Sequence, residues 1–314
     1  MSLFVRKPGI LTTIQDLGRT GSRSLGINSN GVMDVAATRL INALLGNDEN
    51  EAVLEMHFPA GEFEFETGCS IAIGGADLEA QLNGNDLSAW CSHQIRKGDV
   101  LSFKRPNSGN RCYLSVAGGF AIDAWLKSKS TNLTAAAGGL NGRKVLQGDR
   151  ILFADPRTTK PRHLAPTLIP HYSRFPIVRV IAGGEFDLLT AIGERSFLTQ
   201  GFTLSKDSNR MGFRLSGEPL HLLHAKEMIS AAVTFGTIQL LPDGQLVVLM
   251  ADHQTSGGYP RIANVISTDL PLLAQLGPGD GVSFHLVPVE EAENLAIRFN
   301  RDLQILQTGV QLSG

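Results

Sequence analysis

The chain has 314 residues, 28 basic and 30 acidic side chains, and a net charge of −2. This length suffices for two domains, and the hydrophobic share of 42% is ordinary for a globular protein. No basic run or aromatic-interleaved stripe of Lys and Arg points to a nucleic-acid partner. No apolar stretch approaches the roughly 18 residues that a membrane span needs, and the N-terminal segment has no apolar signal core. We therefore expect no nucleic acid, no membrane and a cytoplasmic location.

The three cysteines follow no CxxC spacing and lie in apolar surroundings. Cys69, Cys91 and Cys112 are therefore interpreted as buried thiols in a reducing compartment. The 34 glycines, against three tyrosines and two tryptophans, favour a turn-rich β structure over a helical bundle.

The N-terminal pattern predicts two strands, a polar loop and a helix. Residues 3–14 read as strand, Pro-Gly turn and strand, and 15–21 (QDLGRTG) form a loop with an acid, a base and two glycines. Apolar residues then recur at three- and four-residue intervals over 32–45, which predicts an amphipathic helix that ends at Gly46. Asp34 falls at its start, where a carboxylate suits the helix N-terminus, and we favour this structural role.

Short strands separated by turn chemistry continue over residues 53–153. The Asn-Gly pair at 83–84 is a strong hairpin signal. A pattern of Gly, Asp and an alternating apolar strand that ends in Phe occurs three times, at 98–103, 148–153 and 279–284. Each copy predicts a turn that begins a strand.

The second half begins with a Pro-rich boundary. Residues 156–176 carry five prolines and several basic side chains, which is typical of an extended linker or surface crossing. The run 177–182 opens a second β-rich unit, and 270–276 predict a short helix capped by Asp269. Residues 288–302 predict a charged amphipathic helix.

These boundaries predict two β-rich units, with a poorly ordered tail from Leu303. We assign an N-terminal β-rich domain with one helix to 1–155, a Pro-rich linker to 156–176, a C-terminal barrel domain to 177–290, and a helix and tail to 291–314.

The stretch 251–262 (ADHQTSGGYPRI) is the strongest candidate for a binding site. It follows the apolar run 245–250, which reads as a buried strand, and brings donors, acceptors and paired glycines directly to the strand end. An ordinary polar turn between strands is the alternative interpretation. Its candidate substrate-binding residues are Gln254, Thr255, Gly257, Gly258 and Tyr259.

Five motifs occur in an order that resembles a known family. They are TTIQDLGRTG (12–21), NGVMDVAATRLINALLGN (30–47), SNRMGFRLSG (208–217), FGTIQL (235–240) and ADHQTSGGYPRIANVISTDLPLLAQLGPGD (251–280). Together they resemble the biotin-dependent carboxyltransferase family, also called allophanate hydrolase subunit 2. The likeness covers about residues 3–289 and is nearest to stand-alone members, which include the C subunit of 5-oxoprolinase.

The resemblance implies a mainly β fold with a few helices and a cyclophilin-like β-barrel. It also implies a subunit, inactive alone, of an ATP-hydrolysing amidohydrolase that opens 5-oxoproline to L-glutamate. The implied partners are a smaller paralogous subunit (allophanate hydrolase subunit 1-like) and a lactam-utilisation protein, with ATP and Mg shared with a partner.

Two alternatives remain open within the family. One is a carboxyltransferase component that moves a carboxyl group from biotin on another chain to urea or a related amide. The other is a regulatory protein that binds and neutralises a smaller paralogous kinase inhibitor. The sequence has no phosphate-binding P-loop and no Met-Lys-Met biotin site, so ATP and biotin must be held at least partly elsewhere.

The chemistry of an amide substrate then selects further candidates. Arg19 and Arg210 are natural cations for a carboxylate or phosphate, and Asp16 could move a proton or simply pair with Arg19 as a surface salt bridge. Gln239 could offer its amide to the substrate or satisfy a neighbouring backbone.

Two histidine features complete the candidate residues. His253 stands where the family leads us to expect arginine, so this position loses a fixed positive charge. His221 and His224 lack a third ligand candidate, and we predict no metal site.

Overall fold

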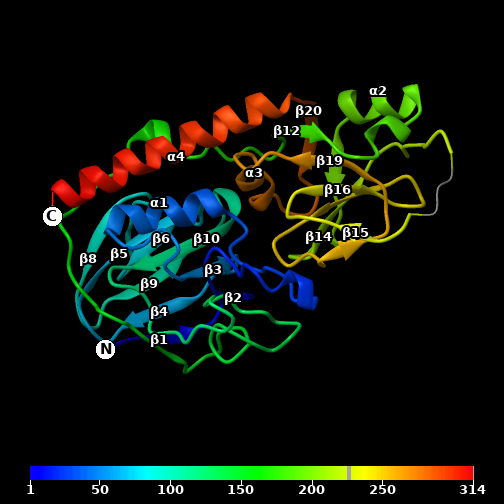
Figure 1. The fold of residues 1–314 in the computed structure, drawn as a ribbon. Helices are drawn as coiled ribbons and strands as arrows, with labels where there is room; N and C mark the ends of the chain where they lie inside the picture. Colours follow the sequence, from blue (N-terminus) through cyan, green and yellow to red (C-terminus); the bar gives the residue numbers. More distant parts are fainter. Residues whose placement is uncertain (225–227, 314) are drawn as a thin grey trace. The chain divides into compact units, whose positions relative to one another are not determined.

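The protein is mainly β with four α-helices in the part of the chain that the structure describes, which confirms the predicted fold class (Figure 1). The computed structural model describes residues 1–224 and 228–313. Residues 225–227 of the predicted barrel domain and Gly314 of the predicted tail therefore lie outside the described residues.

Two compact units divide the chain, and each is assembled from separate segments. The first, which we call the sandwich unit, comprises Met1–Arg19, Asn30–Tyr172 and Asn300–Gly314. The second, which we call the barrel unit, comprises Thr20–Ser29 and Ser173–Phe299. This division differs from the sequence-based one because an N-terminal decapeptide joins the barrel unit and the C-terminal segment joins the sandwich unit.

Two sheets form the sandwich unit. The six-stranded sheet has the order β11-β1-β4-β9-β6-β7, with β1 (Ser2–Lys7), β4 (Glu62–Phe65), β6 (Ala80–Leu82), β7 (Asn85–Asp86), β9 (Val100–Phe103) and β11 (Arg150–Leu152). The five-stranded sheet has the order β2-β3-β10-β5-β8, with β2 (Thr12–Gln15), β3 (Val53–His57), β5 (Cys69–Asp77), β8 (Ser92–Ile95) and β10 (Ser108–Val116). The two strands predicted in residues 3–14 thus form but enter different sheets.

The core of the sandwich unit follows the period-2 alternation of its strands. On β10, Cys112, Leu114 and Val116 enter the apolar cluster between the two sheets. Tyr113, on the opposite face of β10, packs in a second cluster with helix α1 (Val35–Leu45). Because alternate side chains point to opposite faces, β10 is buried on both sides, and α1 adds a third layer (Figure 1).

Helix α1 begins as the sequence predicts. The Asp34 side chain accepts a hydrogen bond from the Ala37 backbone N–H at 2.8 Å, so Asp34 is the N-cap, and Gly46 ends the helix in the left-handed region. The other carboxylate oxygen accepts from the Tyr172 hydroxyl at 2.7 Å. The structural interpretation of Asp34 is confirmed.

Turn chemistry is also local and predictable. Asn83 and Gly84 have φ values of 53° and 81° and join β6 to β7, as a two-residue hairpin turn requires. The three Gly-Asp turns share one geometry: their glycines, at 98, 148 and 279, have φ values of 90°, 87° and 88°. The aspartate after each glycine accepts from the backbone N–H three residues earlier, at 2.7, 2.8 and 2.9 Å.

The predicted linker 156–176 does not run free of the sandwich unit. The backbone N–H and C=O of Arg162 both bond to Ser92 on β8, at 2.8 and 2.9 Å. Leu164 N–H donates to the Trp90 carbonyl at 2.9 Å. These bonds satisfy polar groups beside β8, so the first part of the segment is an ordered crossing.

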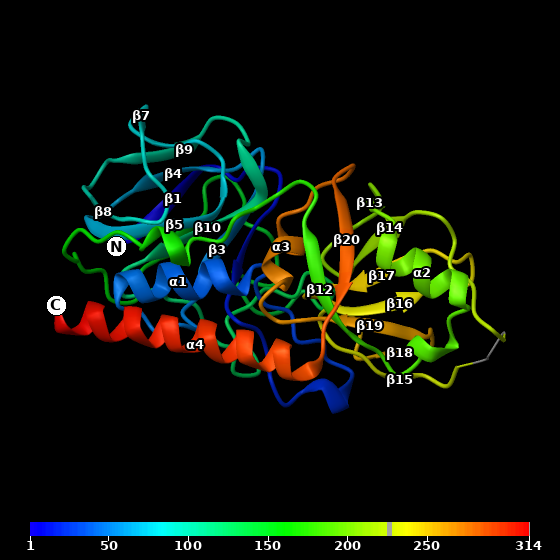
Figure 2. The same cartoon turned by 90° about the horizontal axis from the view of Figure 1, so that it is seen from above.

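Seven strands close the barrel unit in the order β12-β19-β16-β17-β14-β13-β20. They are β12 (Ile177–Ala182), β13 (Phe202–Leu204), β14 (Gly212–Ser216), β16 (Thr237–Leu240), β17 (Leu246–Leu249), β19 (Arg261–Val265) and β20 (Gly281–Leu286). All neighbours are antiparallel except β12 and β20, which lie side by side in parallel and close the barrel (Figure 2). A separate ribbon pairs β15 (Ala231–Ala232) with β18 (Ser256–Gly257).

Two short helices complete the barrel unit. On α2 (Ala191–Thr199), Phe197 stacks on Phe284 of β20 with ring centroids 5.1 Å apart. Asp269 precedes α3 (Leu270–Ala274), as predicted, but makes no side-chain cap. Its carboxylate instead pairs with Arg179, whose Nε and Nη2 donate at 2.9 and 2.6 Å. Asp269 therefore forms an ion pair with Arg179 instead of capping α3.

Helix α4 (Val289–Leu312) extends ten residues beyond the predicted end at 302, so the expectation of a poorly ordered tail from Leu303 is wrong. Leu303 and Val310 are buried, and the Arg162 guanidinium donates to the Val310 carbonyl at 3.2 Å. Burial of an apolar face outweighs the weak local signal of this segment. Among the helices that the structure describes, none has the length and apolarity of a membrane span.

Candidate functional site

Asp16 lies directly after β2 and is only 2% exposed. Its carboxylate accepts four hydrogen bonds, from Gly18 N–H (2.8 Å), Ser128 Oγ (2.7 Å), Ser130 Oγ (2.6 Å) and Lys129 N–H (2.6 Å). The carboxylate therefore fastens the turn after β2 to residues 128–130. This set of donors favours the structural role over proton transfer, because both carboxylate oxygens are already engaged.

Arg19 is also only 2% exposed, so the alternative of a surface salt bridge with Asp16 is wrong. Its Nη1 donates to Asn30 Oδ1 at 2.7 Å, and its Nη2 donates to the Ser130 carbonyl. The guanidinium carbon lies 4.5 Å from the centroid of the Trp125 ring, which is a cation–π distance. Within the sandwich unit, Arg19 is thus held on several sides by groups that the sequence did not point to.

Arg210 has a carboxylate partner in the candidate stretch. Its Nε and Nη2 donate to Asp252 Oδ2 and Oδ1 at 2.9 and 3.0 Å, and the side chains of the two residues are 7% and 14% exposed. The Asp252 backbone N–H also donates to the Arg210 carbonyl at 2.8 Å. The pair fastens the ends of the neighbouring strands β14 and β17, and it balances the charge that the sequence had assigned to an anionic ligand.

His253 is buried, with 2% exposed. Its Nδ1 lies 2.5 Å from the Gln254 carbonyl, and because a carbonyl only accepts, Nδ1 carries the proton. Burial lowers the pKa of His253 from its ordinary 6.5, and the positive charge of Arg23 lowers it further, while the Gln254 carbonyl and Asp252 act in the opposite direction. The ring is therefore neutral at pH 7, as the sequence predicted for this substitution.

Arg23 and Asn28 are site residues that sequence reasoning missed. Both belong to the N-terminal segment that joins the barrel unit. Arg23 Nη2 donates to the Val233 carbonyl and, at 3.4 Å, to the Thr255 carbonyl. Asn28 Nδ2 donates to the Asp252 carbonyl at 2.9 Å. No local pattern could have revealed these contacts, because more than two hundred residues separate the partners.

The first of the paired glycines, Gly257, makes room for a protein side chain. A Cβ on Gly257 would lie 2.5 Å from Gln239 Nε2, so a side chain there would collide with the buried amide. Neither Gly257 nor Gly258 has a positive φ. Gln239 is 1% exposed and its Nε2 donates to the Tyr259 carbonyl at 3.3 Å, while its Oε1 has no hydrogen-bond partner within the described residues.

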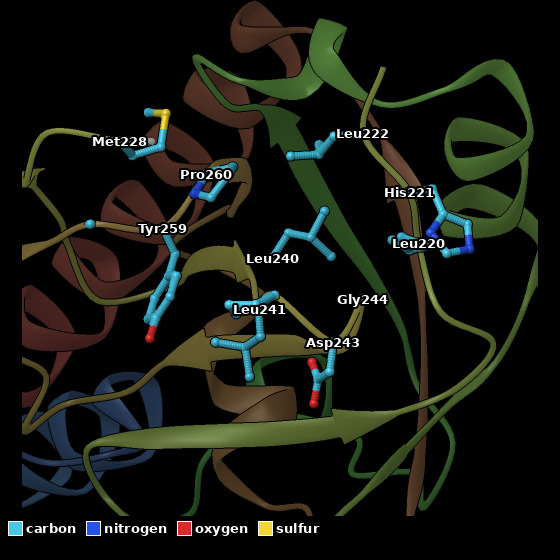
Figure 3. Close-up of a pocket in the computed structure, with 12 residues that line it drawn as sticks. Leu220, His221, Leu222, Met228, Leu240, Leu241, Asp243, Gly244, Tyr259 and Pro260 are labelled. Carbon is cyan, nitrogen blue, oxygen red and sulfur yellow. The ribbon is translucent and has the colours of Figure 1, made fainter. Parts of the chain in front are cut away.

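Tyr259 is 43% exposed and borders a cavity of about 840 Å³ in the barrel unit (Figure 3). Four leucines from two segments contribute to the apolar wall, and Asp243 and His221 add polar groups. Its lining residues are Leu220, His221, Leu222, Met228, Leu240, Leu241, Pro242, Asp243, Gly244, Gly258, Tyr259 and Pro260. The volume is in the range of small-molecule sites.

The predicted site residues thus fall into two groups. Asp16 and Arg19 belong to the sandwich unit. Arg210, Gln239 and the candidates of the 251–262 stretch (Gln254, Thr255, Gly257, Gly258 and Tyr259) belong to the barrel unit. That both groups act on one amide substrate, as the sequence led us to expect, stays a prediction.

The cysteines follow the predicted burial in two of three cases. Cys69 and Cys112 are buried, but Cys91 is only half-buried, and its Sγ lies 3.0 Å from His163 Nδ1. Cys91 lies just before β8, where the 156–176 segment covers it only in part.

Comparisons with known proteins agree on one family. A family model described as carboxyltransferase domain, subdomain A and B, matches residues 25–286. The chain is 38% identical to the 5-oxoprolinase C subunit of Haemophilus influenzae over 284 residues, which cover 90% of each chain. It is 36% identical to the protein of the same name from Escherichia coli K12, over 92% of this chain and 93% of the relative. The crystal structure of Kluyveromyces lactis urea carboxylase matches with a TM-score of 0.92 and 26% identity, over 97% of this chain and 29% of that one.

Proposed function

Because this chain belongs to the family of the carboxyltransferase domain, subdomain A and B, we propose that it is a subunit of a heteromeric, ATP-dependent 5-oxoprolinase that opens 5-oxoproline to L-glutamate. The observation that carries this proposal is that the match covers nearly all of this chain and nearly all of each relative. Two proteins named as the C subunit of 5-oxoprolinase match over nine tenths of their own length and of this chain. The yeast urea amidolyases match 97% of this chain but at most 18% of their own length.

The barrel unit offers groups suited to a cyclic amide. A lactam presents one carbonyl acceptor and one N–H donor, and ring opening requires the carbonyl oxygen to be polarised. Gln254 and Thr255 are half-buried, so their amide and hydroxyl donors are within reach of a small ligand. Gln239 Oε1 is an acceptor without a partner in the described part of the chain, but it is buried and out of reach of a ligand in this conformation.

The described residues do not by themselves identify a site for Mg-ATP. Within residues 1–224 and 228–313, no group of three or more His, Cys, Asp or Glu side chains could hold a metal ion. The sequence also lacks a phosphate-binding P-loop. We therefore assign the nucleotide to a site shared with the proposed partners, a smaller paralogous subunit and a lactam-utilisation protein. The three free cysteines favour a cytoplasmic assembly.

A carboxyltransferase component is the second candidate function. The match to urea carboxylase over 97% of this chain favours it. In that case biotin on another chain would deliver a carboxyl group to urea or a related amide, and labelled bicarbonate would appear in the product. A regulatory protein that only binds its smaller paralogue would give a stable complex without turnover.

Reconstitution tests the proposal. The chain is purified alone and together with the smaller paralogue and the lactam-utilisation protein of the same organism. We expect no turnover by the chain alone, and ATP hydrolysis that depends on 5-oxoproline and yields glutamate in the full assembly. An assembly that forms but ignores 5-oxoproline would refute it, and incorporation of labelled bicarbonate into urea would support the second candidate.

A further inference from the structure

Arg23 is anchored at one corner of its guanidinium group. Of the five N–H donors of an arginine, only those on Nη2 bond to described residues of the barrel unit, namely to the carbonyls of Val233 and Thr255. Nε and Nη1 have no such partner, yet neither is among the buried unsatisfied atoms of the described residues. The remaining edge of the guanidinium is therefore held in place and accessible to solvent.

Within the described residues, Arg23 also forms no ion pair that would compensate its charge. Three other arginines of the barrel unit, Arg179, Arg210 and Arg261, each form an ion pair with an aspartate or glutamate. No carboxylate of the described residues forms an ion pair with Arg23. Its charged neighbour on the candidate loop, Asp252, is already bidentate with Arg210.

The surroundings of Arg23 favour an anion. His253 is neutral at pH 7, so it neither attracts nor repels an anion. The Gln254 and Thr255 side chains that follow it are half-buried. We propose that Arg23, and not Arg210 or position 253, is the anion-binding residue of the barrel unit, and that it takes the carboxylate of a small amide acid. A planar guanidinium edge matches two carboxylate oxygens.

This assignment explains how the unit tolerates histidine at position 253. The positive charge that the family resemblance leads us to expect there is supplied by a segment from the other end of the chain. Naming the ligand as the carboxylate of 5-oxoproline rests on the proposed function. The role of Arg23 as the anion-binding group does not.

Calorimetric titration of the full chain tests the proposal with three probes: 5-oxoproline, 2-pyrrolidinone, which lacks the carboxylate, and inorganic phosphate. We expect 5-oxoproline to bind about ten- to a hundredfold more tightly than 2-pyrrolidinone, the usual effect of one charged hydrogen-bonded contact. Arg23→Gln should remove this difference, and Arg23→Lys should retain part of it. Binding of phosphate but not of 5-oxoproline would overturn the carboxylate assignment.

Two further variants separate the charge from the shape of the loop. Asn28→Ala removes the bond to the Asp252 carbonyl and loosens the same segment, but leaves the guanidinium. Arg195→Gln removes an exposed arginine of α2 that forms no ion pair within the described residues. We expect Arg195→Gln to keep the full preference for 5-oxoproline, and Asn28→Ala to lose less of it than Arg23→Gln does. Equal losses in Asn28→Ala and Arg23→Gln would overturn the role of the charge.

The imidazole of His253 provides a readout independent of turnover. Its NMR titration in the wild-type chain should move to higher pH when 5-oxoproline binds, because the carboxylate offsets the charge of Arg23. Arg23→Gln should cause the same displacement without ligand. A wild-type chain whose His253 signal ignores 5-oxoproline at millimolar concentrations refutes the inference. If the chain binds carboxylates in this way while the assembly ignores 5-oxoproline, only the proposed function fails.

Discussion

Asp252→Asn should destabilise the barrel unit more than any exposed ion pair could. The substitution keeps one acceptor but turns an amide N–H₂ towards the Arg210 guanidinium, so one of the two bonds, at 2.9 and 3.0 Å, is replaced by a contact between donors. Arg210 then keeps a charge that is 7% exposed and incompletely paired. Its burial prevents water from replacing the lost oxygen.

The expected loss of unfolding free energy is about 3 kcal/mol. Removing one partner of a buried pair typically costs about 3–5 kcal/mol, and we use the lower end because the Asp252 side chain is 14% exposed. Exposed ion pairs contribute only about 0–1 kcal/mol, and this is the loss expected if the Arg210–Asp252 pair behaved as an exposed one. Replacing both groups by apolar ones, as in Arg210→Met with Asp252→Leu, should recover most of the loss, since no charge is left buried.

Urea unfolding measures this effect if the two units are followed separately. Both tryptophans, Trp90 and Trp125, lie in the sandwich unit, so their fluorescence reports that unit alone. Hydrogen exchange of peptides from β14 and β17, analysed by mass spectrometry across the urea series, reports the barrel unit. The substitution should shift the barrel transition and leave the tryptophan transition in place.

A loss below about 1 kcal/mol would refute the reasoning, because it would place the pair in the range of exposed salt bridges. A loss of the full size that disappears at high salt would contradict it as well, since buried pairs are screened much less than exposed ones.

Three further predictions concern packing, pH and reactivity. Gly257→Ala should cost about 1–3 kcal/mol, because its Cβ would lie 2.5 Å from Gln239 Nε2, and adding Gln239→Ala should relieve that clash in urea unfolding. Burial lowers the pKa of His253 from 6.5, so the unfolded chain binds a proton that the folded barrel does not. Barrel stability should therefore fall as pH drops below about 6.5, and His253→Asn should flatten this dependence in exchange measured between pH 5 and pH 8. Burial raises the pKa of the Cys69 thiol to about 12, so iodoacetamide should label the half-buried Cys91 first; labelling of Cys69 in the folded protein by mass spectrometry would contradict this.

The Asp16 carboxylate and the Arg210 guanidinium are held by different kinds of partner. Asp16 is held by neutral donors from residues 128–130, whereas Arg210 is held by a full negative charge. By sequence, both were candidates for the chemistry of an amide substrate. The structure instead assigns each of them local bonds in its own unit, whereas Arg23, beside the candidate loop, keeps N–H donors that a ligand can reach.

Local features were predictable because they depend on residues a few positions apart. The cap at Asp34, the Asn-Gly turn at 83–84 and the repeated Gly-Asp turns follow from short-range hydrogen bonds and from backbone angles that glycine tolerates. The extension of α4 beyond residue 302 escaped prediction, since the burial of its last turns is set by other segments of the sandwich unit.

By itself, the sequence determined the β-rich class, the strand and turn positions, the family and the loop at 251–262. Only the tertiary structure decided which distant groups interact. Arg210 pairs with Asp252, which lies 42 residues further along the chain, and Arg23 donates to the Thr255 carbonyl, 232 residues away. The physical reason is that turns and caps are selected within one stretch of backbone, whereas ion pairing and burial depend on which distant segments the closed barrel brings together.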